Sequence, residues 1–277
     1  MPFCSVSKVL NKVTYKNSAI GAFNIHNMEF VQGVVKAAEK EELPIILMIA
    51  EPTIKYAGLE MLATICMDAA DSSKVPVAVA LDHGKTLEII YKSIELGLSV
   101  MFDGSLLPIQ ENTRLTKMIV ERAHKAGVSV EGELGCIAGT EDDITIHESD
   151  LTTPEAATEF VDKTGVDALA VAIGNQHGFY RKAPNLDISR LKAIKKRIEV
   201  PLVLHGGSDL PLIQIKDAIN NGIKKVNIGT DLKYIFAKTL KDELNRESMP
   251  YNPSDFLNSA RQAVERLAGE KIRQFWQ

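Results

Sequence analysis

The chain has 277 residues, of which 45% are hydrophobic and 6% aromatic, and its formal net charge is −4. This length suits one large α/β domain, since barrels of alternating strands and helices often need about 250 residues. The acidic balance argues against a nucleic-acid partner, which would need a concentrated basic face. Three widely spaced cysteines, Cys4, Cys66 and Cys136, predict no disulfide framework and favour a reducing, cytoplasmic setting. No secretory signal and no apolar run of ~20 residues is found, so we expect no membrane partner.

Strand-like and helix-like segments alternate along the whole chain. The predicted strands are short apolar runs without polar alternation, which is typical of parallel strands covered on both faces. They are expected at residues 19–25, 45–50, 77–81, 99–102, 128–130, 168–173, 202–204 and 225–228. Helices are expected at residues 7–13, 29–40, 58–71, 87–96, 109–126, 154–164, 188–197, 212–221, 231–245 and 254–275. Eight strand and helix pairs predict an α/β fold of the (β/α)₈ TIM-barrel type, a single domain over residues 1–277 with extra terminal helices.

The alternative architecture is an open, doubly wound parallel sheet. Such a sheet usually carries a glycine-rich fingerprint after its first strand, whereas residues 24–27 here read Asn-Ile-His-Asn. No linker rich in glycine, serine or proline divides the chain. We therefore expect one closed barrel.

Three predicted strands end in a histidine. VPVAVALDHG reaches His83, LAVAIGNQHG reaches His177 and VPLVLHGGS reaches His205. Strand ends meet on one rim of a barrel, and three imidazoles with one coordination position left open are the pattern of catalytic zinc. Such an ion acts as a Lewis acid on a carbonyl oxygen. The remaining histidines lack this pattern and are expected to be ordinary structural residues: His26, His124 and His147.

Carboxylates accompany these histidines at the predicted rim. Asp82 directly precedes His83, where it is well placed to transfer protons to and from a bound substrate. Asp103 and Glu133 end neighbouring strands. They could hold a cation, orient the histidines through their other ring nitrogens, or be solvated strand-end groups, and the spacing leaves these readings open.

Two glycine-containing loops predict an anion site. Residues 205–208 (HGGS) follow the seventh strand and residues 227–230 (NIGT) follow the eighth, and each loop runs into a helix. Glycine lets the backbone approach a ligand closely, and the amides at a helix start favour an anion. Phosphate sites of barrels often lie after these two strands, so the substrate is expected to carry a phosphate.

Together these segments resemble the class II, metal-dependent ketose-bisphosphate aldolases, which act on fructose 1,6-bisphosphate or tagatose 1,6-bisphosphate. The resemblance covers nearly the whole chain, from Ala22 to the terminal helix. Its most specific segments are LDHG at Leu81, VEGELGCIAGTED at Val130, VAIGNQHG at Val171, PLVLHGGSD at Pro201 and KVNIGTD at Lys225. It implies a lyase of carbohydrate metabolism, as in glycolysis.

The resemblance also implies roles for single residues. Asp82 would exchange the proton of the C4 hydroxyl when the C3–C4 bond is cleaved or formed, and Glu141 would move the proton on the dihydroxyacetone phosphate carbon. The catalytic Zn²⁺ would be held by His83, His177 and His205, and a second divalent position by Asp103 and Glu133. A monovalent cation, Na⁺ or K⁺, is common nearby in this family. The residues that match substrate-binding segments are Asn24, Gly178, Gly206, Gly207, Ser208, Asn227, Ile228, Gly229 and Thr230.

The chain departs from the family pattern at a few positions. Arg261 resembles an arginine that many members extend into a neighbouring subunit to hold the distal phosphate, which implies a homodimer or homotetramer. Arg181 or Lys182 stands in for a lysine near the phosphate, and Ala50 replaces a substrate-contacting serine. These departures leave the sugar open. Fructose 1,6-bisphosphate is the first expectation, followed by tagatose 1,6-bisphosphate and a deoxy-ketogluconate phosphate, with a non-catalytic partner subunit as the reading from another class.

Overall fold

In this computed structural model the described residues are 3–13, 17–141, 144–146, 150–180, 183–246 and 251–276. The central strands are β2 (Ile20–Asn24), β3 (Ile45–Ala50), β4 (Val77–Gly84), β5 (Ser99–Phe102), β6 (Val130–Leu134), β9 (Ala168–Val171), β11 (Leu202–Leu204) and β12 (Ile223–Ile228). Each pairs with its neighbours in parallel, in the order β4-β3-β2-β12-β11-β9-β6-β5, and a β4–β5 pairing closes the ring. The predicted eight-stranded barrel is confirmed.

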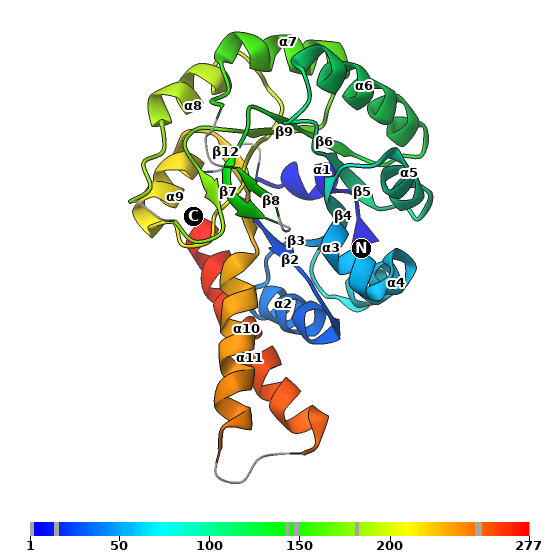
Figure 1. The fold of residues 1–277 in the computed structure, drawn as a ribbon, viewed down its shortest axis with the longest axis vertical. Helices are drawn as coiled ribbons and strands as arrows, with labels where there is room; N and C mark the ends of the chain where they lie inside the picture. Colours follow the sequence, from blue (N-terminus) through cyan, green and yellow to red (C-terminus); the bar gives the residue numbers. More distant parts are fainter. Residues whose placement is uncertain are drawn as a thin grey trace.

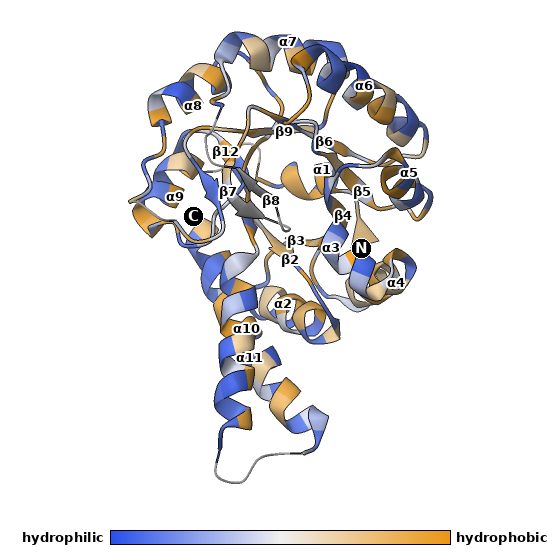
Figure 2. Cartoon of the chain, viewed as in Figure 1, coloured by the Kyte–Doolittle hydropathy of each residue, from blue (hydrophilic) through white to orange (hydrophobic). Residues whose placement is uncertain are grey.

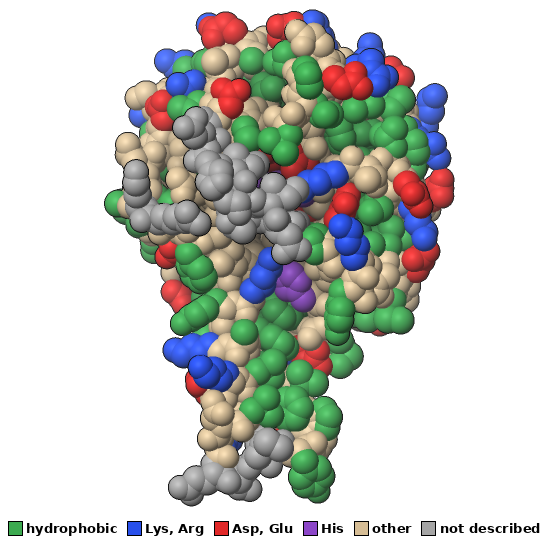
Figure 3. All heavy atoms as spheres, viewed as in Figure 1, with side chains coloured by type: hydrophobic (Ala, Val, Ile, Leu, Met, Phe, Trp, Pro, Cys, Tyr) green, Lys and Arg blue, Asp and Glu red, His purple; other side chains and the backbone are tan. Residues whose placement is uncertain are grey.

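Helices surround this ring (Figure 1). They are α2 (Met28–Glu41), α4 (Leu59–Ser72), α5 (Leu87–Glu95), α6 (Ile109–Lys125), α7 (Pro154–Thr164), α8 (Ile188–Lys195), α9 (Leu212–Asn220), α10 (Thr230–Leu244) and α11 (Pro253–Phe275). Their apolar faces pack on the outside of the strands, while Figure 2 shows hydrophilic residues along the outer faces of α6 and α7. Charged side chains of both signs are dispersed over the rim in Figure 3. No helix among the described residues is long and apolar enough to span a bilayer.

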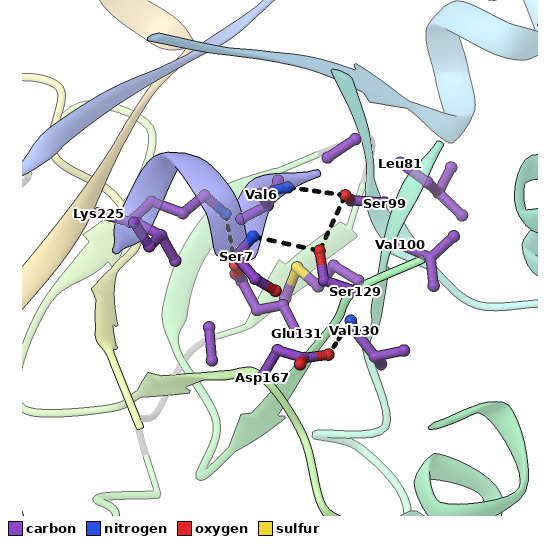
Figure 4. Close-up of a pocket in the computed structure, with 14 residues that line it drawn as sticks. Val6, Ser7, Leu81, Ser99, Val100, Ser129, Val130, Glu131, Asp167 and Lys225 are labelled. Carbon is purple, nitrogen blue, oxygen red and sulfur yellow. Dashed lines mark hydrogen bonds and ion pairs between the residues drawn. The ribbon is translucent and has the colours of Figure 1, made fainter. Parts of the chain in front are cut away.

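The barrel is closed at the amino ends of its strands. There, β1 (Phe3–Cys4) pairs with β4, and α1 (Val6–Leu10) covers the opening. The Val6 amide donates to Ser99 Oγ at 3.0 Å, and the Ser99 and Ser129 hydroxyls lie 3.0 Å apart (Figure 4). The cavity left at this floor measures about 10 Å³, room for about one water molecule. A substrate must therefore enter at the opposite rim.

The terminal helices form a hairpin whose far end extends beyond the barrel (Figure 1). α11 packs along α2, and Gly33 makes the close approach of these helices feasible. A Cβ at Gly33 would lie 2.9 Å from the carbonyl oxygen of Arg261. The α11 helix returns the chain to the barrel, where the Phe275 carbonyl accepts a hydrogen bond from the Ala19 amide.

The structure differs from the predicted elements at the closed floor of the barrel and at the opposite rim. The predicted first helix begins and ends earlier, at α1, and the predicted strand at 128–130 is displaced to β6. An additional helix, α3 (Glu51–Ala57), follows β3 directly. The polar loop after β6 contains two short strands, β7 (Ala138–Glu141) and β8 (Ile144–Ile146), which form a separate sheet with β10 (Gln176–His177) from the loop after β9.

Candidate active site

The end of β4 carries two consecutive site residues. Side chains of a regular strand alternate between its faces, so Asp82 and His83 would ordinarily point apart. The β4–β5 register shifts between Leu81 and Gly84, and His83 has a positive φ of 45°. This left-handed conformation costs a non-glycine residue about 1–3 kcal/mol. Its effect is that both side chains are buried in the barrel mouth.

The three predicted histidine ligands converge there. One ring nitrogen of each of His83, His177 and His205 lies within 4.8 Å of the others. The ring centroids are 5.1 Å apart for His83 and His177, 4.7 Å for His83 and His205, and 5.7 Å for His177 and His205. This is the arrangement that a shared metal ion requires.

Carboxylates fix the tautomers of two of these rings. His83 Nδ1 lies 2.9 Å from Asp103 Oδ2, and His205 Nε2 lies 3.1 Å from Glu131 Oε1, so each of these nitrogens donates its proton to an anion. His83 Nε2 and His205 Nδ1 then present lone pairs to each other across 3.0 Å. Two facing lone pairs repel unless a cation lies between them. The donor set therefore fits a metal ion of zinc type.

Both orienting carboxylates are held in the ionised form. Burial opposes ionisation of Asp103, but hydrogen bonds from His83 and Ser105 outweigh it and lower its pKa. Burial likewise raises the pKa of Glu131, but the charge of Lys225 and the bond from His205 bring it down to about 2. These anions make the imidazoles better electron donors toward a metal.

Glu133 and Asp103 lie beside the same ring. Glu133 Oε2 is 3.9 Å from His83 Nδ1, and one ligand atom each from His83, Asp103 and Glu133 fits within 4.8 Å. Asp103 is seen in the orienting role, bonded to the ring nitrogen that faces away from His205. A second cation would have to bind the same carboxylate oxygens of Asp103 and Glu133. The structure thus brings together every residue of the two predicted metal sites.

Asp82 is held by a neighbouring amide. Asn24 Nδ2 donates to Asp82 Oδ2 at 2.7 Å, and both side chains are buried. Among the described residues Asp82 Oδ1 has no hydrogen-bond partner. One carboxylate oxygen is thus fixed, and the other is available to a substrate proton beside the histidine cluster.

The two predicted phosphate loops are tied together. The Ser208 hydroxyl accepts hydrogen bonds from the amides of Gly229 at 3.3 Å and Asp231 at 3.2 Å, and the Gly207 amide donates to the Asn227 carbonyl at 3.0 Å. These bonds bring the loop after β11 against the first turn of α10. Binding of a phosphate at these two loops stays a prediction.

Glycine is required in one of these loops on steric grounds. Gly206 has φ of +64°, and a Cβ there would lie 1.9 Å from the Gln176 carbonyl oxygen. Gly178 also has positive φ, while Thr230 opens α10. The Ile228 side chain is packed in the core, so only its backbone could contact a ligand.

Other predicted site residues lie elsewhere. The Glu141 backbone ends β7, whereas Arg181 and Lys182 fall outside the described residues. Arg261 lies on α11, where it donates to Gln32 at 2.7 Å and to Asn258 at 2.5 Å. In these contacts Arg261 does not join the histidine cluster of its own chain.

The three histidines predicted to be structural have different surroundings. His124 Nε2 lies 2.9 Å from Asp167 Oδ2 on the outer surface, and His147 falls outside the described residues. His26 Nδ1 lies 3.0 Å from Thr53 Oγ1, in agreement with a structural role. Yet His26 Nε2 is buried with no partner in the described parts of the chain, and the residue lines a pocket at the rim. The sequence signal that could have placed His26 at the rim is its position two residues after the end of β2.

Comparison with known proteins identifies close relatives over the full length. Residues 4–277 match the family model described as fructose-bisphosphate aldolase class-II. A sulfofructosephosphate aldolase of Alkalicoccus urumqiensis is 39% identical over 278 residues, covering 99% of this chain and 97% of the relative. A probable fructose-bisphosphate aldolase of Bacillus subtilis (strain 168) is 38% identical over 279 residues, covering 99% and 98%.

Solved structures agree with this. The YdjI aldolase from Escherichia coli K12 superposes with a TM-score of 0.89 at 36% identity, covering 99% of this chain and 97% of that one. A putative fructose-1,6-bisphosphate aldolase from Coccidioides immitis gives a TM-score of 0.88 at 30% identity, covering 98% and 96%. These values describe one shared fold carried by related sequences.

Proposed function

The chain belongs to the class-II fructose-bisphosphate aldolase family, and we propose that it reversibly cleaves a ketose 1,6-bisphosphate, fructose 1,6-bisphosphate first, into dihydroxyacetone phosphate and glyceraldehyde 3-phosphate. The observation that carries the proposal is the approach of His83 Nε2 and His205 Nδ1 to 3.0 Å, with a ring nitrogen of His177 completing the set. A zinc ion bound there supplies a Lewis acid for the substrate carbonyl.

The remaining chemistry falls to protein side chains. Asp82 accepts the proton of the C4 hydroxyl as the C3–C4 bond breaks and returns it in the reverse reaction, and Asn24 fixes the carboxylate by a bond of 2.7 Å. Glu141, at the end of β7, moves the proton on the dihydroxyacetone phosphate carbon. The tied loops at Ser208 and Gly229 hold the phosphate of that half.

The distal half of the substrate is less constrained. The relative named for sulfofructosephosphate, at 39% identity, supports a second candidate in which a sulfonate replaces the distal phosphate. Tagatose 1,6-bisphosphate and a deoxy-ketogluconate phosphate remain alternatives from the sequence. All four share an aldol bond beside a phosphorylated ketone or keto acid, so the metal and Asp82 would serve each of them.

We also propose that the protein is a homo-oligomer, at least a dimer, on the resemblance of Arg261, and that it is cytoplasmic, on its three widely spaced cysteines. Within one chain this guanidinium is bonded to Gln32 and Asn258, so it would serve a site only across a subunit interface. Sedimentation of the wild type gives the mass directly. If the protein is a fully active monomer at nanomolar concentration, Arg261 does not contribute to the active site of a neighbouring subunit.

The central test is metal dependence. Dialysis against a chelator should abolish cleavage of the bisphosphates, added Zn²⁺ should restore it, and borohydride with substrate should leave the enzyme active, because no lysine Schiff base forms. His177→Ala should lose bound zinc and activity, whereas His124→Ala, which alters a surface histidine bonded to Asp167, should retain both. Full activity in the metal-free protein would refute the proposal. One zinc per chain without cleavage of any sugar phosphate would favour a non-catalytic subunit.

A further inference from the structure

The three proposed metal ligands do not receive the same support from the barrel. His83 lies within β4 and His205 directly follows β11, so barrel strands carry both of them. His177 lies six residues beyond Val171, the end of β9. Its own strand, β10, belongs to the small sheet with β7 and β8 rather than to the barrel. Contacts other than the barrel ladder must therefore fix His177 relative to His205.

The hydroxyl of Tyr180 joins the two segments. It accepts a hydrogen bond from the Gln176 amide at 3.0 Å and donates one to the Gly206 carbonyl at 3.1 Å. Gln176 precedes His177 and Gly206 follows His205, so a single oxygen atom is bonded to a chain neighbour of each ligand. Burial raises the pKa of Tyr180 to about 12, so at neutral pH the hydroxyl keeps the proton that it donates.

The bond from Gln176 closes a tight turn around His177. Gln176 and Tyr180 are four residues apart, and Gly178 between them has a φ of +80°, in the left-handed region that suits glycine. The Gln176 carbonyl oxygen also packs directly against Gly206, where an added Cβ would lie 1.9 Å away. The ligand is thus part of a closed segment that lies against the loop after β11.

Tyr180 is itself held at its ring and at its backbone. The ring packs against the main hydrophobic core. The Tyr180 amide donates to Asp209 Oδ2 at 3.0 Å, and Asp209 belongs to the same loop after β11. These two anchors limit the movement of the hydroxyl away from Gln176 and Gly206.

A buried amide ties the base of the same turn. Asn175 Nδ2 donates to the His205 carbonyl at 3.1 Å, and Asn175 Oδ1 accepts a hydrogen bond from the Ile173 amide at 2.9 Å. Asn175 therefore connects the chain after β9 to the backbone of one ligand, and Tyr180 connects the far side of the turn. The segment that carries His177 is fastened to β11 on both sides of the ligand.

We propose that Tyr180 is a positioning residue of the metal site, whose hydroxyl fixes His177 relative to His205 and thereby raises the affinity of the site for zinc. Ligands that already lie at the required separation lose less conformational entropy when the ion binds. The inference rests on the proposed aldolase function, and it assigns a role to a side chain that is bonded to backbone groups beside the ligands.

Tyr180→Phe is the test, because it removes the hydroxyl and keeps the ring. Zinc affinity, measured on the purified full chain by competition with a chelator, should fall about 10-fold, at the low end of the losses for groups that support metal ligands. Activity should fall at limiting zinc and return when zinc is added in excess. The matched control is Tyr91→Phe on α5, where the Arg122 guanidinium lies 4.0 Å from the ring centre. This control should bind zinc as tightly as the wild type.

A merely structural role for Tyr180 gives a different result. Tyr180→Phe would then lower the urea midpoint of the metal-free protein but leave the zinc affinity unchanged, and excess zinc would not restore activity. That result would overturn the proposal. An equal loss of zinc affinity in Tyr180→Phe and Tyr91→Phe would overturn it too.

The wild type offers a second test that does not depend on the folding of any variant. Coupling between two sites is reciprocal, so zinc must strengthen the bond between Gln176 and Tyr180, and hydrogen exchange at the Gln176 amide should slow about 10-fold when zinc is added. An unchanged exchange rate would contradict the inference while the proposed function stands, provided that the zinc-loaded wild type cleaves a sugar phosphate. If the wild type binds zinc and cleaves none, the proposed function fails, and zinc affinity and Gln176 exchange still decide the role of Tyr180.

Discussion

Glu131 and Lys225 form an ion pair of 2.7 Å inside the barrel (Figure 4), and the other oxygen of Glu131 accepts the proton of His205 Nε2 at 3.1 Å. All three side chains are buried. The lysine thus neutralises the carboxylate that is bonded to His205, a proposed metal ligand. A buried pair contributes little net stability, but removal of one partner leaves an uncompensated charge.

Lys225→Met should therefore lower the free energy of unfolding by about 3–5 kcal/mol and weaken zinc binding about 10- to 100-fold. Urea denaturation and competition with a chelator measure the two effects. The matched control is the double variant Glu131→Gln with Lys225→Met, in which the amide oxygen still accepts from His205 and no charge remains. It should recover most of the stability. A single variant as stable as the wild type would contradict the role of the pair.

Asp82→Asn should separate proton transfer from metal binding. The amide cannot take the proton of the C4 hydroxyl, so kcat should fall about 10²- to 10⁴-fold. Bound zinc, measured by atomic absorption, and the unfolding midpoint should stay at wild-type values, because Asp82 is bonded to Asn24 and is not among the ligand groups. Loss of zinc together with activity would place Asp82 in the coordination sphere instead.

Gly206→Ala should destabilise the loop after β11. The new Cβ would lie 1.9 Å from the Gln176 carbonyl oxygen at a φ of +64°, so the backbone must move, at a cost of about 3 kcal/mol or more. Gly97 offers the matched control, since its φ of +79° is similar but no atom lies within 4 Å of the added Cβ. Gly97→Ala should cost only about 1 kcal/mol. Thermal unfolding of both variants measures the loss of stability. Equal losses would show that the positive φ alone sets the cost and that the close contact of the new Cβ adds nothing.

His26 should make stability depend on pH. Its pKa is lowered from 6.5 to about 4, mainly by burial, so on acidification the unfolded chain takes up the proton first. The contribution of this residue is complete above pH 6.5 and is lost as the pH falls toward 4. Between pH 7 and 4.5 the loss should be about 2 to 3 kcal/mol, and His26→Asn should remove this part of the dependence. Urea titrations at both pH values measure the free energy of unfolding. The same change in this free energy between the two pH values for wild type and variant would refute the prediction.

The barrel strands and the histidine cluster could be predicted because their signals are local. A buried parallel strand is a continuous apolar run, and the ends of such strands must share a rim, so His83, His177 and His205 could be grouped without knowing any distance. The helices α2, α5 and α7 likewise have their own apolar periodicity and N-terminal caps.

What could not be predicted depends on partners far apart in the chain. Nothing near Lys225 in the sequence indicates that it pairs with Glu131, 94 residues earlier. The short strands β1 and β10 have two residues each, too few for any periodicity. The helix α3 does have a local signal, the proline at residue 52 in its first turn. Its seven residues are too few to show an apolar periodicity, so the segment resembles a loop in the sequence.

The pairing of β10 with β7 links His177, a proposed metal ligand, to the strand that ends at Glu141, the proposed acid. Gly139 of β7 is the Cα partner of His177, and Glu141 stands two residues further along the same strand. Whatever immobilises the His177 ring also steadies the backbone that presents the acid. Amide hydrogens of residues 138–141 should then exchange more slowly once zinc is bound. The ion would thereby order the backbone at Glu141 through the pairing of β10 with β7, without contacting Glu141 itself.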